Sequence, residues 1–280
     1  MTDTKITSVV AKEENGNIQI TFTIPYPLVS STQEKVIQDY AKEAEIPGFR
    51  KGNAPIEKVK GKIPTESLIE KSLARILPEA LSAAINENRL RPAIYPKFEL
   101  ISANENEAWQ IRAVTCELPK VILPDYKKLI REGVIKTPKE MPKEEKEQKV
   151  IKILLDNIKI GVPELLVKEE VDARLSSLLQ RIEKLGLSLE GYLGSVGKNP
   201  EKLRGEYELQ ARNTIILELT LNEIITDQKI EIPDSQVDEA IKASSADIKL
   251  AESLNTPEQK RIIKSVLARR AALDSLITLI

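Results

Sequence analysis

The chain reads IPGFRKGNAP at residues 46–55, between two stretches with helical spacing. Pro47-Gly48 is typical of a turn, Gly52 can adopt a positive φ, and Pro55 can begin a new helical turn. We therefore expect this segment to protrude as a defined loop, with Phe49-Arg50-Lys51 at its tip.

Basic residues are concentrated in and just after this loop. Between residues 46 and 62 the only acidic residue is Glu57, whereas the basic residues are Arg50, Lys51, Lys58, Lys60 and Lys62. An aromatic ring beside a guanidinium and an ammonium group is typical of a hot spot that binds carboxylates or phosphates. The spacing leaves one alternative open, in which Phe49 packs into the protein's own core.

Outside the loop, helices are predicted at residues 27–45 and 64–89 because apolar residues recur there every three or four positions. Farther out, period-two patterns predict two β-hairpins, with strands at residues 5–11, 18–24, 96–102 and 109–114. Residues 1–135 should therefore form an α+β domain, with the helices on one face of a small sheet.

The strand pattern ends near residue 135. Residues 136–149 are highly charged and contain two prolines, which predicts an exposed connector. Residues 150–280 have helical periodicity, and prolines suited to a first helical turn lie at Pro163, Pro200, Pro233 and Pro257. The second domain is therefore predicted to be an all-α, elongated array of helices.

Composition excludes several kinds of chemistry. The chain has no histidine and one cysteine, Cys116, which rules out histidine-dependent nucleophilic catalysis and a zinc or iron–sulfur site. No other group of residues has the spacing of a catalytic or cofactor site. We expect no catalytic residues, no metal and no cofactor.

The 42 basic and 43 acidic residues give a net charge of −1, so contact with nucleic acid has to be local. The N-terminal residues lack the basic and apolar regions of a signal peptide. The longest uncharged run, residues 15–33, alternates like a strand rather than a membrane span. We expect a cytoplasmic protein that does not enter a membrane.

The loop residues Gly48, Phe49, Arg50, Gly52 and Pro55 resemble the Gly-Phe-Arg-x-Gly-x-x-Pro signature of trigger factor, a bacterial ribosome-associated chaperone. Residues 1–130 resemble the ribosome-binding domain of that family, and the helical half resembles its substrate-binding domain. The resemblance implies that the tip, with Lys51 as its third residue, docks on a tunnel-exit ribosomal protein and the adjoining ribosomal RNA.

The sequence departs from the family in one respect. Trigger factors usually carry a prolyl isomerase domain between these two parts, whereas here residues 125–129 lead into the connector and then directly into helix. We therefore expect a form without that domain and without its enzymatic activity.

Apolar stripes in the helical half admit two interpretations, a closed core or a partly open surface for unfolded chains. The candidate client-binding residues are Leu175, Leu178, Leu179 and Ile182.

The favoured function is an ATP-independent holdase that binds nascent polypeptides at the ribosome, and the resemblance also implies links to protein transport and cell division. The alternatives are residual prolyl isomerase activity and a nucleic-acid-binding module. The sequence leaves open whether the free protein forms a homodimer.

Overall fold

A computed structural model describes residues 5–47, 49–53, 55–134, 141–244 and 255–280. The chain forms two compact units. The first comprises Met1–Leu118 with Pro163–Leu166, and the second comprises Pro119–Val162 with Val167–Ile280. Each unit has its own hydrophobic core, and each is described by itself.

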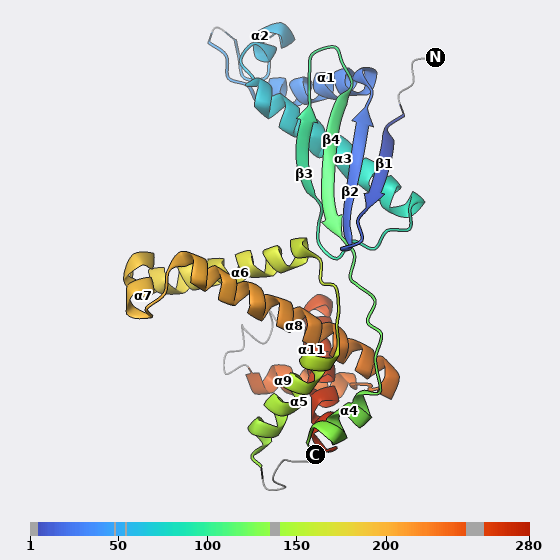
Figure 1. The fold of residues 1–280 in the computed structure, drawn as a ribbon. Coiled ribbons are helices and arrows are strands. Elements are labelled where there is room, and N and C mark those ends of the chain that lie inside the picture. The colour runs from blue at the N-terminus through green and yellow to red at the C-terminus, as the bar shows by residue number, and fades with distance from the viewer. Residues whose placement is uncertain (1–4, 48, 54, 135–140, 245–254) are drawn as a thin grey trace. The chain divides into compact units, whose positions relative to one another are not determined.

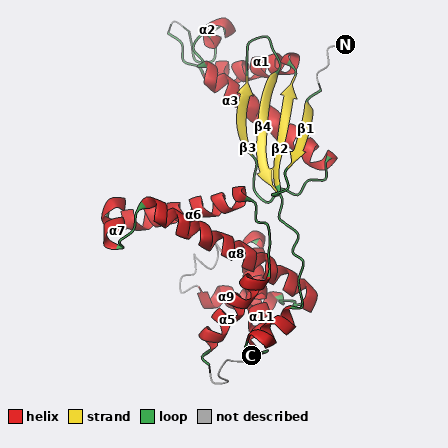
Figure 2. Cartoon of the chain, in the orientation of Figure 1, coloured by secondary structure: helices red, strands yellow, loops and turns green. Residues whose placement is uncertain are grey.

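A four-stranded antiparallel sheet forms the centre of the first unit (Figure 2). Its strands lie in the order β1-β2-β4-β3, with bounds β1 Thr7–Lys12, β2 Asn17–Ile24, β3 Lys97–Ser102 and β4 Trp109–Cys116. In β2 every second residue is buried, namely Ile18, Ile20, Phe22 and Ile24. This alternation places one face of the sheet in the core, because successive strand residues point to opposite faces.

Two helices pack on the buried face of the sheet, α1 (Tyr26–Glu43) and α3 (Thr65–Glu87) (Figure 1). Side chains from both helices join the strand residues in the core, including Val29, Ile76, Leu77, Leu81 and Ala84. The small antiparallel sheet near the N-terminus and its two hairpins are as predicted.

The loop of interest lies between α1 and the short helix α2 (Ile56–Lys60). Three buried residues, Ala41, Ile46 and Val59, form a separate small cluster that joins the end of α1, the start of the loop and α2. The two ends of the loop are therefore fixed by the same apolar contacts.

After residue 118 the described chain is helical and contains no strand. Its helices are α4 Tyr126–Gly133, α5 Lys143–Asn157, α6 Glu164–Lys184, α7 Leu189–Ser195, α8 Pro200–Gln228, α9 Asp234–Ser244 and α11 Pro257–Ile277. The main core of the second unit gathers residues from α4, α5, α8 and α11, among them Ile130, Leu154, Ile224 and Leu276. The prediction of a mostly helical chain is confirmed.

The structure divides the chain earlier than the sequence predicted, between residues 118 and 119 rather than near residue 135. Helix α4 packs into the helical unit through Tyr126 and Ile130, and the Tyr126 hydroxyl donates a hydrogen bond of 2.6 Å to Asp227 Oδ2 on α8.

The predicted connector, residues 136–149, also differs from the structure. Helix α5 begins at Lys143, well inside it, because Glu and Lys are good helix formers even where they are fully solvated. Residues 135–140 lie outside the described part of the chain.

Candidate functional site

The loop after α1 is built from two consecutive turns. The amide of Phe49 donates to the carbonyl of Ile46 at 3.0 Å, and the amide of Asn53 donates to the carbonyl of Arg50 at 2.9 Å. Ile46 is buried, so it fastens the first turn to the protein. The backbone between these turns therefore projects from a fixed base.

Gly52 closes the loop against the end of α1. Its φ is +79°, as the sequence predicted, and its amide donates to the carbonyl of Ala44 at 3.3 Å. A Cβ atom at this position would lie 2.9 Å from the carbonyl oxygen of Lys42. Both the backbone conformation and the close approach require glycine.

Pro55 comes directly before α2, and its carbonyl accepts hydrogen bonds from the amides of Lys58 and Val59 at 3.0 and 3.2 Å. Pro55 therefore begins the helical turn, as expected from its fixed φ. Gly48, the remaining residue of the predicted signature, lies outside the described part of the chain.

The three tip residues are accessible to solvent. Phe49 is 37% exposed, Arg50 is exposed, and Lys51 Nζ lies 3.7 Å from Glu45 Oε1 in an exposed ion pair. The alternative in which Phe49 packs into the core is wrong, since Ile46 supplies the buried contact instead. A half-exposed ring followed in the chain by two cationic residues is suited to binding a partner that carries carboxylates or phosphates.

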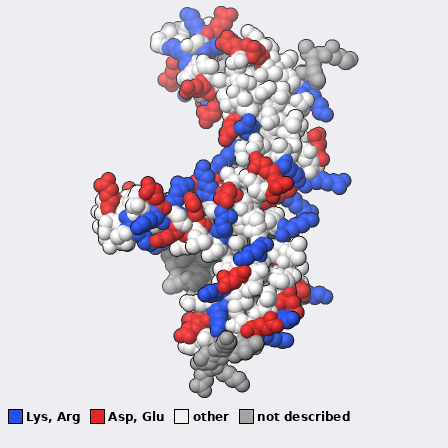
Figure 3. All heavy atoms as spheres, viewed as in Figure 1, with Lys and Arg blue, Asp and Glu red and all other residues white. Residues whose placement is uncertain are grey.

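Charged side chains on the face seen in Figure 3 show no comparable concentration of one sign. Figure 3 shows basic and acidic side chains intermixed over the visible face, in keeping with the net charge of −1. Among the described residues, no group of three or more Cys, Asp or Glu side chains could hold a metal ion, and none of the described helices is long and apolar enough to cross a membrane.

The four candidate client-binding residues of α6 have different environments. Leu178 and Ile182 are buried in a cluster with Leu193 and Leu203, and Leu175 packs against that cluster. Leu179 is 45% exposed. The assignment of Leu178 and Ile182 to a client-facing surface therefore requires correction, because α6 uses these residues to pack on α7 and α8.

The sequence did not single out three exposed apolar residues, which are Leu187 and Leu189 at the α6–α7 turn and Val196 directly after α7. They lie at or beyond the helix ends, where the 3.6-residue period that marks an apolar stripe is interrupted.

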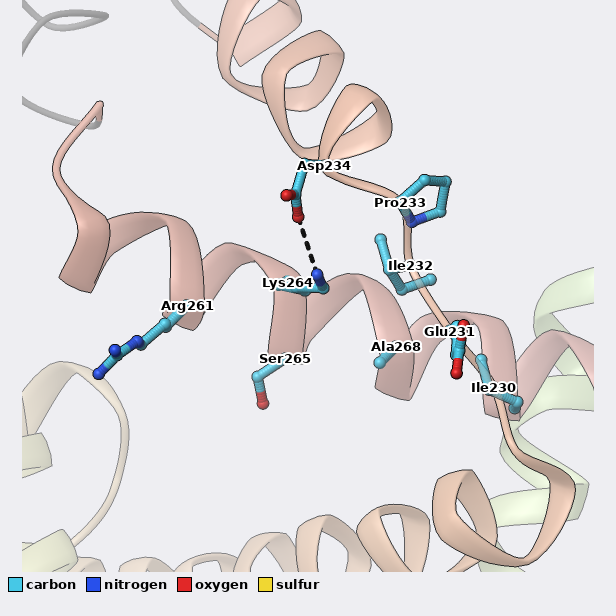
Figure 4. A pocket seen from close by; sticks show the side chains of 9 residues that line it. All are labelled: Ile230, Glu231, Ile232, Pro233, Asp234, Arg261, Lys264, Ser265 and Ala268. Atoms are coloured by element: carbon cyan, nitrogen blue, oxygen red, sulfur yellow. Dashed lines mark hydrogen bonds and ion pairs between the residues drawn. The ribbon is translucent and has the colours of Figure 1, made fainter.

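A groove of about 710 Å³ is a second feature that the sequence did not indicate. It lies where the non-helical segment 230–233 runs beside α11, and Ile230, Ile232 and Ala268 supply its apolar lining (Figure 4). Lys264 points toward Asp234 and forms a 2.8 Å ion pair, which lowers the pKa of that carboxyl. The groove thus combines apolar surface with the charged groups of Arg261 and Lys264.

Comparison with known proteins extends these observations. A family model described as bacterial trigger factor protein (TF) matches residues 6–154, and one described as its C-terminus matches residues 123–278. The two matches overlap, so no further segment separates them.

Curated relatives show the same relationship. A trigger factor of Streptococcus pyogenes serotype M4 (strain MGAS10750) is 31% identical over 167 residues, which are 60% of this chain and 35% of the relative. The trigger factor of serotype M5 (strain Manfredo) is 31% identical over 163 residues, which are 58% of this chain and 36% of the relative. The aligned region is thus about a third of each relative.

A solved structure described as "Promiscuous Substrate Recognition in Folding and Assembly Activities of the Trigger Factor Chaperone" shares the fold, with a TM-score of 0.62 at 12% identity. The alignment covers 97% of this chain and 99% of that one. With two family models that each match more than half of its residues, the chain belongs to the trigger factor family, in a form that lacks the prolyl isomerase domain between the two matched parts.

Proposed function

We propose that this protein is an ATP-independent, ribosome-associated holdase of the cytoplasm. In this proposal the loop at residues 48–55 binds a tunnel-exit ribosomal protein and the adjoining ribosomal RNA, and the helical unit shields emerging apolar segments. Membership in the trigger factor family supports a chaperone role.

One observation carries the ribosome-binding part of the proposal, the exposed tip Phe49-Arg50-Lys51 on a loop whose base is fixed. The ring can enter an apolar pocket while the guanidinium and ammonium groups form charge-assisted hydrogen bonds. Because Gly52 and Ile46 hold the loop in place, little conformational entropy is lost on binding.

The test is cosedimentation of the full chain with ribosomes. Replacing Phe49, Arg50 and Lys51 together by Ala should lower affinity by more than about tenfold, since a ring and two charge-assisted contacts are lost. Added salt should weaken binding of the unmodified chain.

A matched control replaces Tyr95, Arg91 and Lys35 by Ala, which removes the same types of exposed side chain elsewhere. If the tip variant binds as well as the control, the loop is not the ribosome contact.

The holdase part of the proposal needs only weak, reversible burial of client surface, at about 25 cal/mol per Å². Exposed Leu179, Leu185 and Leu187, together with the groove beside α11, offer such surface without any catalytic group. Prolyl isomerisation is not favoured, because the overlapping family matches leave no separate isomerase segment.

A further inference from the structure

We propose that Lys58 is a positioning residue for the loop tip, whose ammonium group holds the Phe49 ring in the orientation that a partner meets. Lys58 Nζ lies 5.0 Å from the centroid of the Phe49 ring. This inference rests on the proposed ribosome-binding function but concerns a residue outside the Gly-Phe-Arg-x-Gly-x-x-Pro signature.

The contact joins two segments with a common anchor. Lys58 precedes Val59, which is buried with Ala41 and Ile46, so the backbone of Lys58 is held by the apolar cluster at the base of the loop. Phe49 donates its amide to Ile46, a member of the same cluster. The ring and the ammonium group therefore approach each other from two fixed backbones.

No carboxylate of the described residues competes with the ring for the Lys58 ammonium group. Within the described part of the chain, no carboxylate lies at ion-pair distance from Lys58, whereas Lys51 is paired with Glu45. An ammonium group over a ring face is attracted to the negative face of the π system. Lys58 thus lies over one face of the ring, and the attraction favours the ring orientation that brings the two groups together.

Holding the ring in one orientation lowers the entropy lost when a partner binds. A cation–π contact at an exposed site corresponds to about a two- to fivefold effect on an equilibrium constant. Lys58 should contribute that factor only while Phe49 is present, because it acts through the ring. A lysine that contacts phosphate directly would instead act independently of Phe49 and would contribute to the salt dependence.

A double-mutant cycle separates these roles, using cosedimentation of the full chain with ribosomes. The variants are Phe49→Ala, Lys58→Met, both together and Lys58→Arg. The matched control is Lys62→Met, an exposed lysine just beyond the end of α2 that contacts no ring among the described residues. Lys58→Met should weaken binding about two- to fivefold. Lys58→Arg should retain binding, and Lys62→Met should not reproduce the coupling to Phe49.

In the Phe49→Ala background, Lys58→Met should have no further effect, and alone it should leave the salt dependence unchanged. Additive effects, or a salt slope lower by about one, would mean that Lys58 is a separate phosphate contact and would overturn the inference. Unchanged binding of Lys58→Met would overturn it as well.

A second measurement does not use ribosomes. In NMR spectra of the free full chain, the Lys58 Cε–H resonances should be shifted upfield by the ring current of Phe49, and the shift should disappear in Phe49→Leu. Absence of the shift would overturn the inference even if ribosome binding is found. If the shift is present but the unmodified chain does not cosediment with ribosomes, the proposed function fails, and with it the role of Lys58, although the contact itself stands.

Discussion

Gly52 is the residue on which the geometry of the loop depends most directly. Its positive φ of +79° and its hydrogen bond to Ala44 bring the chain back to the end of α1. An L-residue in this conformation is strained by about 1–2 kcal/mol, and a Cβ atom 2.9 Å from the Lys42 carbonyl oxygen adds a steric clash with backbone. A substitution at Gly52 should thus alter the position of the tip residues while their own side chains remain unchanged.

Gly52→Ala is therefore expected to lower ribosome affinity and to destabilise the first unit by about 1–2 kcal/mol. Chemical denaturation and cosedimentation would measure the two effects. Gly61→Ala is the matched control, because Gly61 has a right-handed conformation with φ −67° and its Cβ would lie 3.8 Å from the nearest atom. Equal stability of the two variants would show that the strain at Gly52 is relieved by movement of the loop.

The residues of the tip could be predicted from sequence, because Pro, Gly, Phe, Arg and Lys have strong local preferences for turns and for binding surfaces. The contact between Lys58 and Phe49 could not be predicted. It depends on how α2 folds back over the loop, which is decided by the burial of Val59 with Ala41 and Ile46 rather than by local spacing.

Among the elements, α1 and α3 are joined by a polar contact that depends on pH. The Arg75 guanidinium, which donates to Asp39, and the neighbouring Lys42 lower the pKa of Asp39 from 3.8 to about 2. Since the pKa of this carboxyl is lower in the folded than in the unfolded state, its stabilising effect is present above pH 4 and is lost as the pH falls toward 2.

Asp39→Asn should consequently lower the melting temperature slightly at neutral pH and by much less near pH 2, where about half of the folded-state carboxyl groups are protonated. The difference should shrink in high salt, because the pair is exposed. Thermal melts at the two pH values would test this, with Glu34→Gln as a control on the exposed face of the same helix. A difference as large at pH 2 as at neutral pH would mean that the side chain acts through its shape rather than its charge.

Helix α6 shows how adjacent residues of one apolar run can differ in burial. Leu178 and Leu179 differ by about 100° around the helix axis, so Leu178 is buried against Leu193 and Leu203 while Leu179 is exposed. The sequence could not assign them, because the stripe is continuous across both positions and its orientation depends on where α7 and α8 pack.

Leu178→Ala is expected to destabilise the helical unit by about 2–3 kcal/mol, since it opens a cavity in a packed cluster. Leu179→Ala should change stability by less than about 0.5 kcal/mol. Denaturant titrations of the two full-length variants would provide the comparison. Loss of aggregation suppression by Leu179→Ala without loss of stability would add support for a client contact at this position, whereas equal destabilisation by both would contradict the burial seen here.

At the scale of the whole molecule, the sequence predicted the type of each half better than the place where the halves divide. Period-two and period-3.6 patterns identified the sheet and the long helices, because each pattern extends over many residues. Helix α4 was missed because it has only eight residues and three apolar positions, which is too short a run for its helical spacing to stand out in the sequence. Its Tyr126 and Ile130 are buried in the core of the helical unit.

This division predicts the limits of an active helical fragment. A fragment of residues 119–280 retains Tyr126 and Ile130, which are buried in the core of the helical unit, and should unfold cooperatively. A fragment of residues 140–280 loses both side chains and should be less stable by about 3–6 kcal/mol, at about 1.5–3 kcal/mol for each buried apolar side chain. Denaturant titrations of the two fragments would measure this difference.

The longer fragment should suppress aggregation of an unfolded protein without added nucleotide, because its exposed apolar residues, including Leu179, Leu185 and Leu187, are retained. Light scattering at increasing ratios of fragment to client would follow the effect, with the full chain as reference. The shorter fragment is the control for non-specific hydrophobic association, since a partly unfolded chain would aggregate with the client instead of keeping it in solution. If residues 119–280 fold and yet leave aggregation unchanged at several-fold excess, client binding does not reside in the helical unit and the holdase surface has to be sought on the first unit.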